Sequence, residues 1–284
     1  MKKIAIKTIG CKLNQYDSQA IAEPFLQHGC EWVKFDQPAD VYIINTCTVT
    51  GRADYSSRQA VSRAVRTAES GGSKNGVIVV TGCYAEVDPE TLKDIEGADI
   101  VIGNRGKANI YEVVAEYLET GIVPLLDEVD PAERCSIWGR AITGMKGYSR
   151  AFIKIQDGCN SNCSYCIVPR ARGNETSRSP EEISSEIERL SSAGYREVVL
   201  TGVHIGRYNY SGLKFYELLK EILSGDGPRI RFSSIEPNEI NDNLIDVIAG
   251  NNRFCRHIHI PVQSGSDRIL KAMNRGYRAE KIHK

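Results

Sequence analysis

Short apolar runs alternate with amphipathic stretches along the first 120 residues. The apolar runs are IAIKTI (4–9), VYIIN (41–45), GVIVVT (76–81) and ADIVIG (98–103), and a helical pattern follows each of them. Buried strands that alternate with helices are typical of βαβ units around a parallel sheet. We therefore expect an α/β domain with a parallel sheet over residues 1–120.

The same alternation returns in the second half of the chain. Its apolar runs are AFIKIQ (151–156), EVVLTG (197–202), RIRFSSI (229–235) and HIHIPV (257–262). The helix after the first run is predicted to start at Ser179 as N-cap, with Glu182 completing a capping box. Four βα units of about thirty residues each indicate an α/β barrel or part of one over residues 146–284. Gly, Pro and acidic residues between the halves predict a linker at 121–145.

Composition is that of a globular protein, with 41% hydrophobic and 25% charged residues. No apolar run approaches the roughly 20 residues that a membrane-spanning helix needs. The start MKKIAIKTIG lacks the apolar stretch and cleavage site of a signal peptide, so we expect a cytoplasmic protein without membrane association. Nine cysteines in a cytoplasmic chain indicate metal binding or redox chemistry, because disulfides are rare there.

Three cysteines in the second half have the spacing C-x3-C-x2-C directly after a predicted strand. They are Cys159, Cys163 and Cys166. Thiolates hold iron–sulfur clusters, and three ligands on a 4Fe–4S cluster leave one iron open. A structural zinc site is the alternative, and it would need a distant ligand such as His204, His257 or His259.

Three cysteines in the first half each follow a predicted strand. Cys11, Cys47 and Cys83 lie at the carboxyl ends of the first three runs, and those ends share one edge of a parallel sheet. We therefore expect these thiols to converge into a second triad with an open iron. The alternative is an ordinary buried cysteine, which we assign to Cys30, Cys135 and Cys255.

The C-x3-C-x2-C motif, with Tyr165 before its last cysteine, resembles that of the radical S-adenosylmethionine superfamily. The resemblance implies that S-adenosylmethionine chelates the open iron and is cleaved to a 5′-deoxyadenosyl radical. It also implies a cofactor site at the carboxyl ends of the barrel strands. The residues expected there are Tyr165, Thr201, Gly202, Glu236, Gln263 and Ser264.

Nearly the whole chain resembles one family of radical enzymes, the methylthiotransferases. The matching stretches are GCKLNQYDS (10–18), NTCTVTGRADYSSRQ (45–59), TGCYAE (81–86), GCNSNCSYCIVPRARG (158–173), LTGVHIGRY (200–208), SSIEP (233–237) and HIPVQSGSDRILKAMNRGY (259–277). GCKLN, TVTGRAD and TGVHIG look like the branch that acts on N6-threonylcarbamoyladenosine at position 37 of tRNA. The resemblance then implies methylthiolation of carbon 2 with two 4Fe–4S clusters, the second on Cys11, Cys47 and Cys83.

The implied partners are the tRNA anticodon stem-loop, a low-potential electron donor such as flavodoxin, and a sulfur donor. Between residues 140 and 180 there are seven basic and two acidic residues, and such a stretch favours an anionic partner. Arg170, Arg172 and Arg178 are candidates for contacting RNA phosphates or the threonyl carboxylate. The alternative for each is a surface arginine or a salt bridge. The sequence assigns no catalytic side chain.

Members of this family run further, with six βα units and a terminal RNA-binding β domain, so we expect this chain to be truncated. Alternatives within the family are an enzyme acting on isopentenyladenosine in tRNA or on a ribosomal protein. Alternatives from other classes are a non-catalytic iron–sulfur or zinc binding module, and a radical enzyme with a single cluster.

Overall fold

The protein divides into two compact units. The structure, a computed structural model, describes residues 1–70, 76–124 and 141–283. Residues 1–142 and 170–172 form the first unit, and residues 143–169 and 173–284 form the second. Most of the expected linker 121–145, including Cys135, lies outside the described residues.

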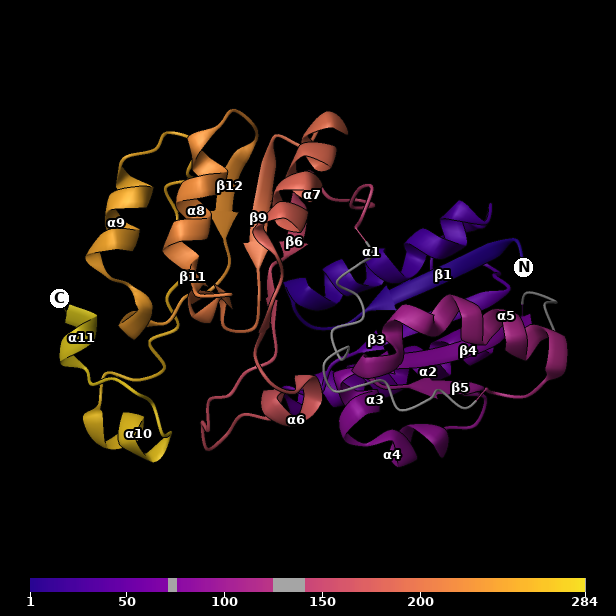
Figure 1. Cartoon of the computed structure of the whole chain (residues 1–284). Helices are drawn as coiled ribbons and strands as arrows, with labels where there is room; N and C mark the ends of the chain where they lie inside the picture. Colours follow the sequence, from indigo (N-terminus) through magenta and orange to yellow (C-terminus); the bar gives the residue numbers. More distant parts are fainter. Residues whose placement is uncertain (71–75, 125–140, 284) are drawn as a thin grey trace. The chain divides into compact units, whose positions relative to one another are not determined.

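The first unit is built on a parallel sheet, as the sequence predicts, and the sheet has five strands (Figure 1). They are β1 (Lys3–Thr8), β2 (Glu31–Val33), β3 (Val41–Thr46), β4 (Val77–Gly82) and β5 (Ile100–Ile102), in the order β2-β1-β3-β4-β5. Every residue of β3 and β4 is buried, which explains why both read as unbroken apolar runs. The sequence does not predict the edge strand β2, because only three residues form it and one of them is buried.

Helices cover both faces of this sheet. On one face α1 (Lys12–Gln27) and α5 (Ile110–Thr120) pack against residues such as Ile43. On the other face α2 (Gly51–Ser70), α3 (Cys83–Val87) and α4 (Pro89–Lys93) pack against Tyr42 and Ile44. Adjacent residues of β3 thus enter opposite cores, as alternate side chains of a strand must. A 3₁₀ turn, η1 (Asn104–Asn109), connects β5 to α5.

The second unit carries three parallel strands in the order β12-β9-β6. They are β6 (Ala151–Lys154), β9 (Glu197–Thr201) and β12 (Arg229–Phe232). Its helices include α7 (Pro180–Ser192), α8 (Phe215–Ser224), α9 (Asp242–Ala249), α10 (Asp267–Ala272) and α11 (Glu280–His283). The connections between them include a short antiparallel pair, β7 (Gln156–Asp157) with β8 (Thr176–Ser177), and two 3₁₀ turns, η2 (Ile205–Arg207) and η3 (Pro237–Glu239). The last three residues of α6 (Val168–Arg172) belong to the first unit.

Two local expectations were wrong. Residues 257–262 do not form a strand, and the described pairing of this stretch with the loop after β12 is one bridge between Ser234 and His259. Its alternate apolar residues Ile258, Ile260 and Val262 are 37–38% exposed, so burial of one face does not stabilise an extended strand here. At α7, the Ser179 side chain accepts from the Glu182 amide at 3.2 Å, but the Glu182 carboxylate lies near Arg178 Nε at 3.4 Å instead of closing the box.

Within the described residues, no helix combines the length and apolar character that crossing a bilayer requires.

An ion cluster at the start of β9 generates a pH prediction. Glu197 accepts from Arg229 at 2.8 Å, Arg231 at 2.9 Å and Arg150 at 3.3 Å. Burial raises the pKa of this carboxyl, but the three guanidinium groups outweigh burial and lower the pKa from 4.5 to about 2. The ionised form is therefore stabilising above pH 4.5, and the stabilisation is lost as the pH falls towards 2.

Glu197→Gln should lower the free energy of unfolding at pH 7 by about 2 kcal/mol. The pKa shift alone corresponds to about 3 kcal/mol, which we reduce because Arg150 and Arg229 are 49% and 62% exposed. Urea unfolding followed by circular dichroism measures the difference between variant and wild type at several pH values. It should shrink between pH 5 and pH 2; a difference independent of pH would contradict the ion cluster.

Candidate functional site

The three N-terminal cysteines lie at the ends of three adjacent strands. Cys11 precedes α1 as its N-cap, Cys47 follows β3, and Cys83 follows β4 as the first residue of α3. The register aligns Thr8 with Asn45 and Thr46 with Gly82, so the strands end level with one another. The cysteine-bearing segments consequently meet at one edge of the sheet.

The segments at this edge approach one another closely. A Cβ added to Gly10 would lie 2.8 Å from the Cβ and 2.9 Å from the Sγ of Cys47. Burial raises the pKa of the Cys47 thiol, and the neighbouring Cys83 and Cys11 raise it further, whereas Arg172 opposes them. The three sulfurs are therefore near enough to influence one another, although among the described residues they do not reach the spacing of a site for a single ion.

Side-chain amides and hydroxyls tie the strand ends together. Asn14 Nδ2 donates to the carbonyls of Ile9 at 2.8 Å and Thr46 at 2.9 Å, bridging the loops that carry Cys11 and Cys47. Asn45 Nδ2 donates back to the Asn14 carbonyl at 2.9 Å. Thr46 Oγ1 donates to the Thr81 carbonyl at 2.5 Å, which links the ends of β3 and β4.

Glycine is required directly before Cys83. Gly82 has a φ of 103°, and an added Cβ would lie 2.3 Å from the Thr46 carbonyl oxygen and 2.6 Å from the Thr46 nitrogen. Both atoms are backbone and cannot rotate away. The absence of a side chain at Gly82 is thus what lets the Cys83 segment approach the end of β3.

A buried group of charges accompanies this triad in the first unit. Asp17 lies 2.9 Å from Lys107 Nζ and 3.3 Å from Arg172 Nη2, and all three side chains are at most 5% exposed. Arg172 also donates to Asn14 Oδ1 at 2.5 Å. In addition, Asn104 Nδ2 lies 3.6 Å from the Cys83 sulfur.

Two of the three arginines expected on RNA are engaged inside the protein. Arg172 pairs with Asp17, and Arg178 is 4% exposed and pairs with Glu186. The ion-pair alternative therefore holds for Arg172 and Arg178. Arg170 is the exposed member of the set.

The second unit holds the other three cysteines in the loop after β7. Cys159 is buried, and Cys163 and Cys166 are partly buried. The segment after α10 anchors the loop: the Ser164 amide donates to the Met273 carbonyl at 3.2 Å, and Asn274 Nδ2 donates to the Asn162 carbonyl at 2.8 Å. Burial raises the pKa of the Cys166 thiol, and Cys163 and Cys159 add to this.

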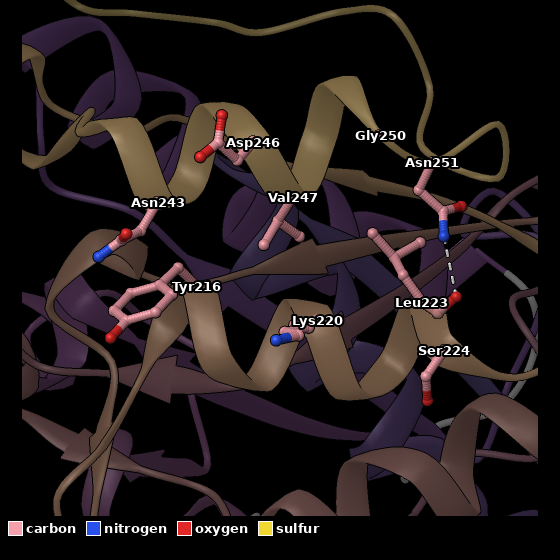
Figure 2. Close-up of a pocket in the computed structure, with 9 residues that line it drawn as sticks. All are labelled: Tyr216, Lys220, Leu223, Ser224, Asn243, Asp246, Val247, Gly250 and Asn251. Atoms are coloured by element: carbon pink, nitrogen blue, oxygen red, sulfur yellow. Dashed lines mark hydrogen bonds between the residues drawn. The ribbon is translucent and has the colours of Figure 1, made fainter.

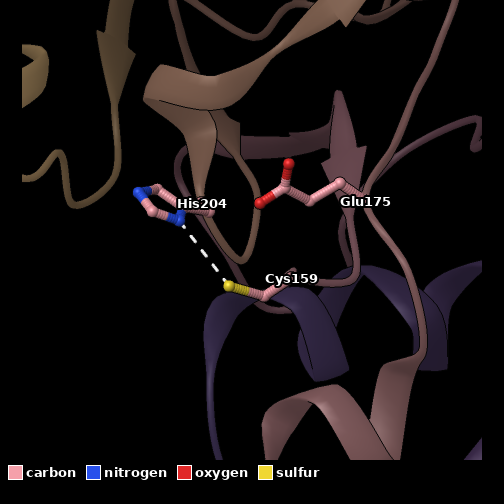
Figure 3. Close-up of side chains that lie close together, drawn as sticks. All are labelled: Cys159, Glu175 and His204. Carbon is pink, nitrogen blue, oxygen red and sulfur yellow. Dashed lines mark hydrogen bonds between the residues drawn. The ribbon is translucent and has the colours of Figure 1, made fainter. Parts of the chain in front are cut away.

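His204 and Glu175 lie beside Cys159 (Figure 3). His204 Nδ1 is 3.6 Å from the sulfur, and its Nε2 is 2.5 Å from Glu239. Burial lowers the pKa of His204, but Cys159 and Glu239 outweigh burial and raise the pKa to about 10. Burial would raise the pKa of the Cys159 thiol, whereas hydrogen bonds with His204 and Ser161 bring it below its usual value.

This grouping bears on the zinc alternative. Ligand atoms of Cys159, Glu175 and His204 lie within 4.8 Å of one another, a spacing suited to a single ion. Cys163 and Cys166 stand outside that group of described residues, and His259 is engaged by Ser234 Oγ at 2.7 Å. A four-iron cluster is larger than one ion, so its thiolates do not need single-ion spacing.

Arg275 lies beside the second cysteine of the motif. Its Nη1 is 3.3 Å from the Cys163 sulfur and 3.4 Å from Tyr165 Oη, and its Nη2 is paired with Glu236. The Arg275 side chain is 5% exposed. Burial opposes its charge, but Glu236 and Cys163 raise the pKa of the guanidinium, so Arg275 presents a permanent cation to the sulfur.

The residues expected on S-adenosylmethionine fall into two sets. Tyr165 and Glu236 are joined through Arg275, and Thr201 ends β9 with a buried Oγ1 that has no hydrogen-bond partner among the described residues. Gly202 lies against Gln156, whose Oε1 would be 2.9 Å from an added Cβ. In contrast, Gln263 is exposed at a φ of 60°, and Ser264 Oγ bonds within its own loop, to the Ser266 amide at 3.1 Å.

Sequence reasoning gives no role to several residues that shape these sites. Asn14, Asp17 and Arg275 all lie inside stretches that carry the family resemblance. His204 enters from the sequence only as a zinc ligand. The motifs mark these positions, but spacing along the chain does not show which sulfur or carboxylate each one meets.

A pocket of about 510 Å³ between α8 and α9 lies apart from these residues (Figure 2). Tyr216, Lys220 and Asp246 are among its lining residues, and Asn251 Nδ2 closes one end with a 2.9 Å bond to the Leu223 carbonyl. None of the residues expected at a cofactor site lines it.

Two family models match the chain. Residues 3–103 match a family described as uncharacterized protein family UPF0004, and residues 153–284 match the radical SAM superfamily. Among solved structures, the radical S-adenosylmethionine methyltransferase TsrM from Kitasatospora setae has a TM-score of 0.65 at 16% identity, covering 99% of this chain and 64% of that one. This likeness establishes the fold.

Curated relatives match almost the whole chain. Threonylcarbamoyladenosine tRNA methylthiotransferase MtaB of Bacillus subtilis is 40% identical over 99% of this chain, and that of Aquifex aeolicus is 38% identical over 98%. A tRNA-2-methylthio-N(6)-dimethylallyladenosine synthase of Clostridium botulinum is 35% identical over 97%. The chain spans 62%, 67% and 62% of these three relatives.

The close approach at Gly82 generates a prediction about iron content. Gly82→Ala should lower iron after anaerobic reconstitution from about eight to about four per chain, because the Cys83 segment can no longer reach the end of β3. The matched control is Gly29→Ala, whose φ of 80° gives comparable backbone strain but whose Cβ would meet nothing within 4 Å. Equal iron loss in the two variants would show that strain, not the strand-end approach, is responsible.

The Arg275 contact generates a prediction about reduction potential. Hydrogen bonds and charge at the sulfurs set the potential of an iron–sulfur cluster, and removal of a cation disfavours the reduced, more negative state. Arg275→Gln should make the potential of a cluster bound by Cys159, Cys163 and Cys166, the ligands that the sequence predicts, about 60 mV more negative, a tenfold change for one electron. Electron paramagnetic resonance during a redox titration measures it.

Arg275→Lys should restore part of that shift. Arg278 is exposed, so Arg278→Gln is the matched control, with no effect expected. Iron content is measured on every sample. An unchanged potential in an Arg275→Gln protein that retains its iron would contradict the assigned contact.

Proposed function

Because the chain belongs to the radical S-adenosylmethionine methylthiotransferase family, we propose that it methylthiolates carbon 2 of N6-threonylcarbamoyladenosine at position 37 of tRNA. The observation that carries the proposal is the N-terminal triad, Cys11, Cys47 and Cys83, at the level ends of β1, β3 and β4. A radical enzyme needs one cluster to start its chemistry. A second three-cysteine site fits a reaction that also delivers sulfur.

The residues present fit two 4Fe–4S clusters and S-adenosylmethionine. Each triad offers three free thiols, which leaves one iron of each cluster for a non-protein ligand. The buried Thr201 Oγ1 without a described partner, next to Gly202, fits a site completed by a bound polar group. When bound, these cofactors supply the radical chemistry that breaks an unactivated C–H bond.

The chain's own residues would hold and orient these groups. Cys159, Cys163 and Cys166 would ligate one cluster, with His204 and Arg275 orienting two of the three sulfurs through the contacts described above. Cys11, Cys47 and Cys83 would ligate the other, and Asn14, Asn45 and Thr46 would keep those loops in register. Tyr165 and Glu236 remain the proposed cofactor contacts, together with Thr201, Gly202, Gln263 and Ser264.

The threonylcarbamoyl branch is the substrate we favour. Relatives bearing that name are 38–40% identical to this chain in Bacillus, Aquifex and Chlamydia and 34% identical in Thermotoga maritima, whereas those named for dimethylallyladenosine are 35–36% identical. The difference is small but lies in the same direction as the motifs GCKLN, TVTGRAD and TGVHIG. The proposal also includes a domain division near residues 120–146, a cytoplasmic location, an electron donor such as flavodoxin, and a sulfur donor.

Nucleoside mass spectrometry tests the proposal. Cells that lack the complete gene should contain N6-threonylcarbamoyladenosine without its 2-methylthio derivative, and the wild-type gene should restore the derivative. Cys83→Ala and Cys163→Ala should each fail to restore it, because each removes a ligand of a different cluster. Cys30→Ala is the matched control, since Cys30 belongs to neither triad and the variant should support full modification.

Restoration of the 2-methylthio derivative of isopentenyladenosine instead would move the substrate to the other tRNA branch. Restoration of neither derivative by the wild-type gene would reject tRNA methylthiolation. Full activity of Cys83→Ala would reject the second cluster.

A further inference from the structure

A positively charged hollow lies on the α2 face of the first unit. Its volume is about 540 Å³. The wall is made by side chains from α2, by one residue of β1 and by one residue after β2. The residues that carry the argument are Lys7, Phe35, Tyr55, Arg58, Arg63 and Arg66.

The cations of this hollow have little internal compensation. Among the described residues, one ion pair joins a lining cation to an acid, Arg63 with Asp36 at 3.9 Å, and both side chains are more than half exposed. Arg58 donates to the neutral Tyr84 hydroxyl at 2.9 Å. Arg63 and Arg66 are three residues apart on one helix face, where like charges destabilise the helix. An anion in the hollow would relieve that repulsion.

Aromatic rings lie among these cations. Tyr55 is 56% exposed. A tyrosine ring loses little conformational freedom when a ligand packs on it, so it is a suitable surface for stacking. Gln59 Nε2 donates to the Tyr55 hydroxyl at 2.6 Å, which restrains the ring one turn away on α2. Exposed aromatic rings beside arginines suit an unpaired base on the ring and its phosphates on the guanidinium groups.

The chain connects the hollow to the segments that carry the N-terminal triad. Lys7 lies in β1, four residues before Cys11, and α2 begins four residues after Cys47. The Tyr84 hydroxyl that accepts from Arg58 belongs to the residue after Cys83. Each cysteine-bearing segment therefore contributes to this wall or is bonded to it.

We propose that this hollow binds the phosphate backbone and an unpaired base of RNA. That the RNA is a tRNA anticodon stem-loop rests on the proposed function. The charge and the exposed ring are independent of it. Because Arg172 and Arg178 are committed to buried ion pairs, the exposed arginines of α2 take over the role expected of them.

The test is the affinity of the full-length, cluster-loaded protein for a fluorescently labelled anticodon stem-loop over a salt series. Arg63→Gln and Arg66→Gln should each weaken binding several-fold, and the double variant about tenfold or more. The slope of log affinity against log salt should become shallower by roughly 0.7 to 0.9 for each phosphate that is no longer neutralised. Tyr55→Ala should weaken binding with the slope unchanged, because stacking involves no counterion release.

Lys93→Gln is the matched control. It removes one exposed positive charge from the same unit, at α4 and outside the hollow, where Lys93 pairs with Glu90 at 2.8 Å. Affinity and slope should match wild type. Equal weakening of RNA binding in Lys93→Gln and Arg66→Gln would show that binding depends only on net charge, and would overturn the proposal. Wild-type affinity of the Arg63→Gln/Arg66→Gln protein would overturn it as well.

The outcome is separable from that of the proposed function. If tRNA in cells is methylthiolated while the α2 variants bind RNA as wild type does, the hollow is rejected and the function stands. If the variants lose RNA affinity while no methylthio nucleoside is found, the hollow stands as an RNA site and the function is rejected. A wild-type protein without affinity for the stem-loop rejects the hollow.

Discussion

The register of three adjacent parallel strands is the constraint on which the N-terminal site depends. Pairing of Thr46 with Gly82, and of Thr8 with Asn45, makes β1, β3 and β4 end at one level. Cysteines 36 residues apart in sequence then become neighbours without any local motif. The three loops that follow these strands are therefore crowded at one edge of the sheet. A glycine allows one loop to approach the backbone of β3, and side-chain amides bridge neighbouring loops.

The two triads handle negative charge differently. In the second unit, cationic side chains approach the sulfurs directly: His204 lies at Cys159 and Arg275 at Cys163. In the first unit, the cations Lys107 and Arg172 are paired with Asp17, and burial together with neighbouring thiols raises the pKa of Cys47. Burial and neighbouring thiols raise the pKa of Cys166 in the second unit in the same way, so the difference lies at Cys159, where hydrogen bonds with His204 and Ser161 outweigh burial and lower the pKa. Metal binding needs deprotonated thiols, so Cys159 is the ligand best prepared for it.

Features of this protein could be predicted from the sequence when the residues that form them are close together in the chain. Strands β3 and β4 and the cysteines after them could be predicted, because apolar runs and the next residue are local signals. The contact of Arg275 with Cys163 spans 112 residues and that of Arg172 with Asp17 spans 155, and no spacing rule reaches so far. The stretch 257–262 misled for a related reason: its pattern suits a strand, but a strand also needs a partner along its length.

Burial decides which arginines are available to a polyanion. Arg172 and Arg178 stand in a basic stretch of the sequence, yet each is held against a buried carboxylate. To contact a phosphate, either would have to leave Asp17 or Glu186 as an unpaired buried charge, which costs several kcal/mol, more than an exposed phosphate contact returns. An exposed arginine of α2 can contact a phosphate without leaving a buried carboxylate unpaired. Charge clustering in sequence therefore predicts RNA contacts only after the internally paired cations have been set aside. Of the three arginines after Cys166 this leaves Arg170, and the exposed arginines of α2 join it as the proposed contacts.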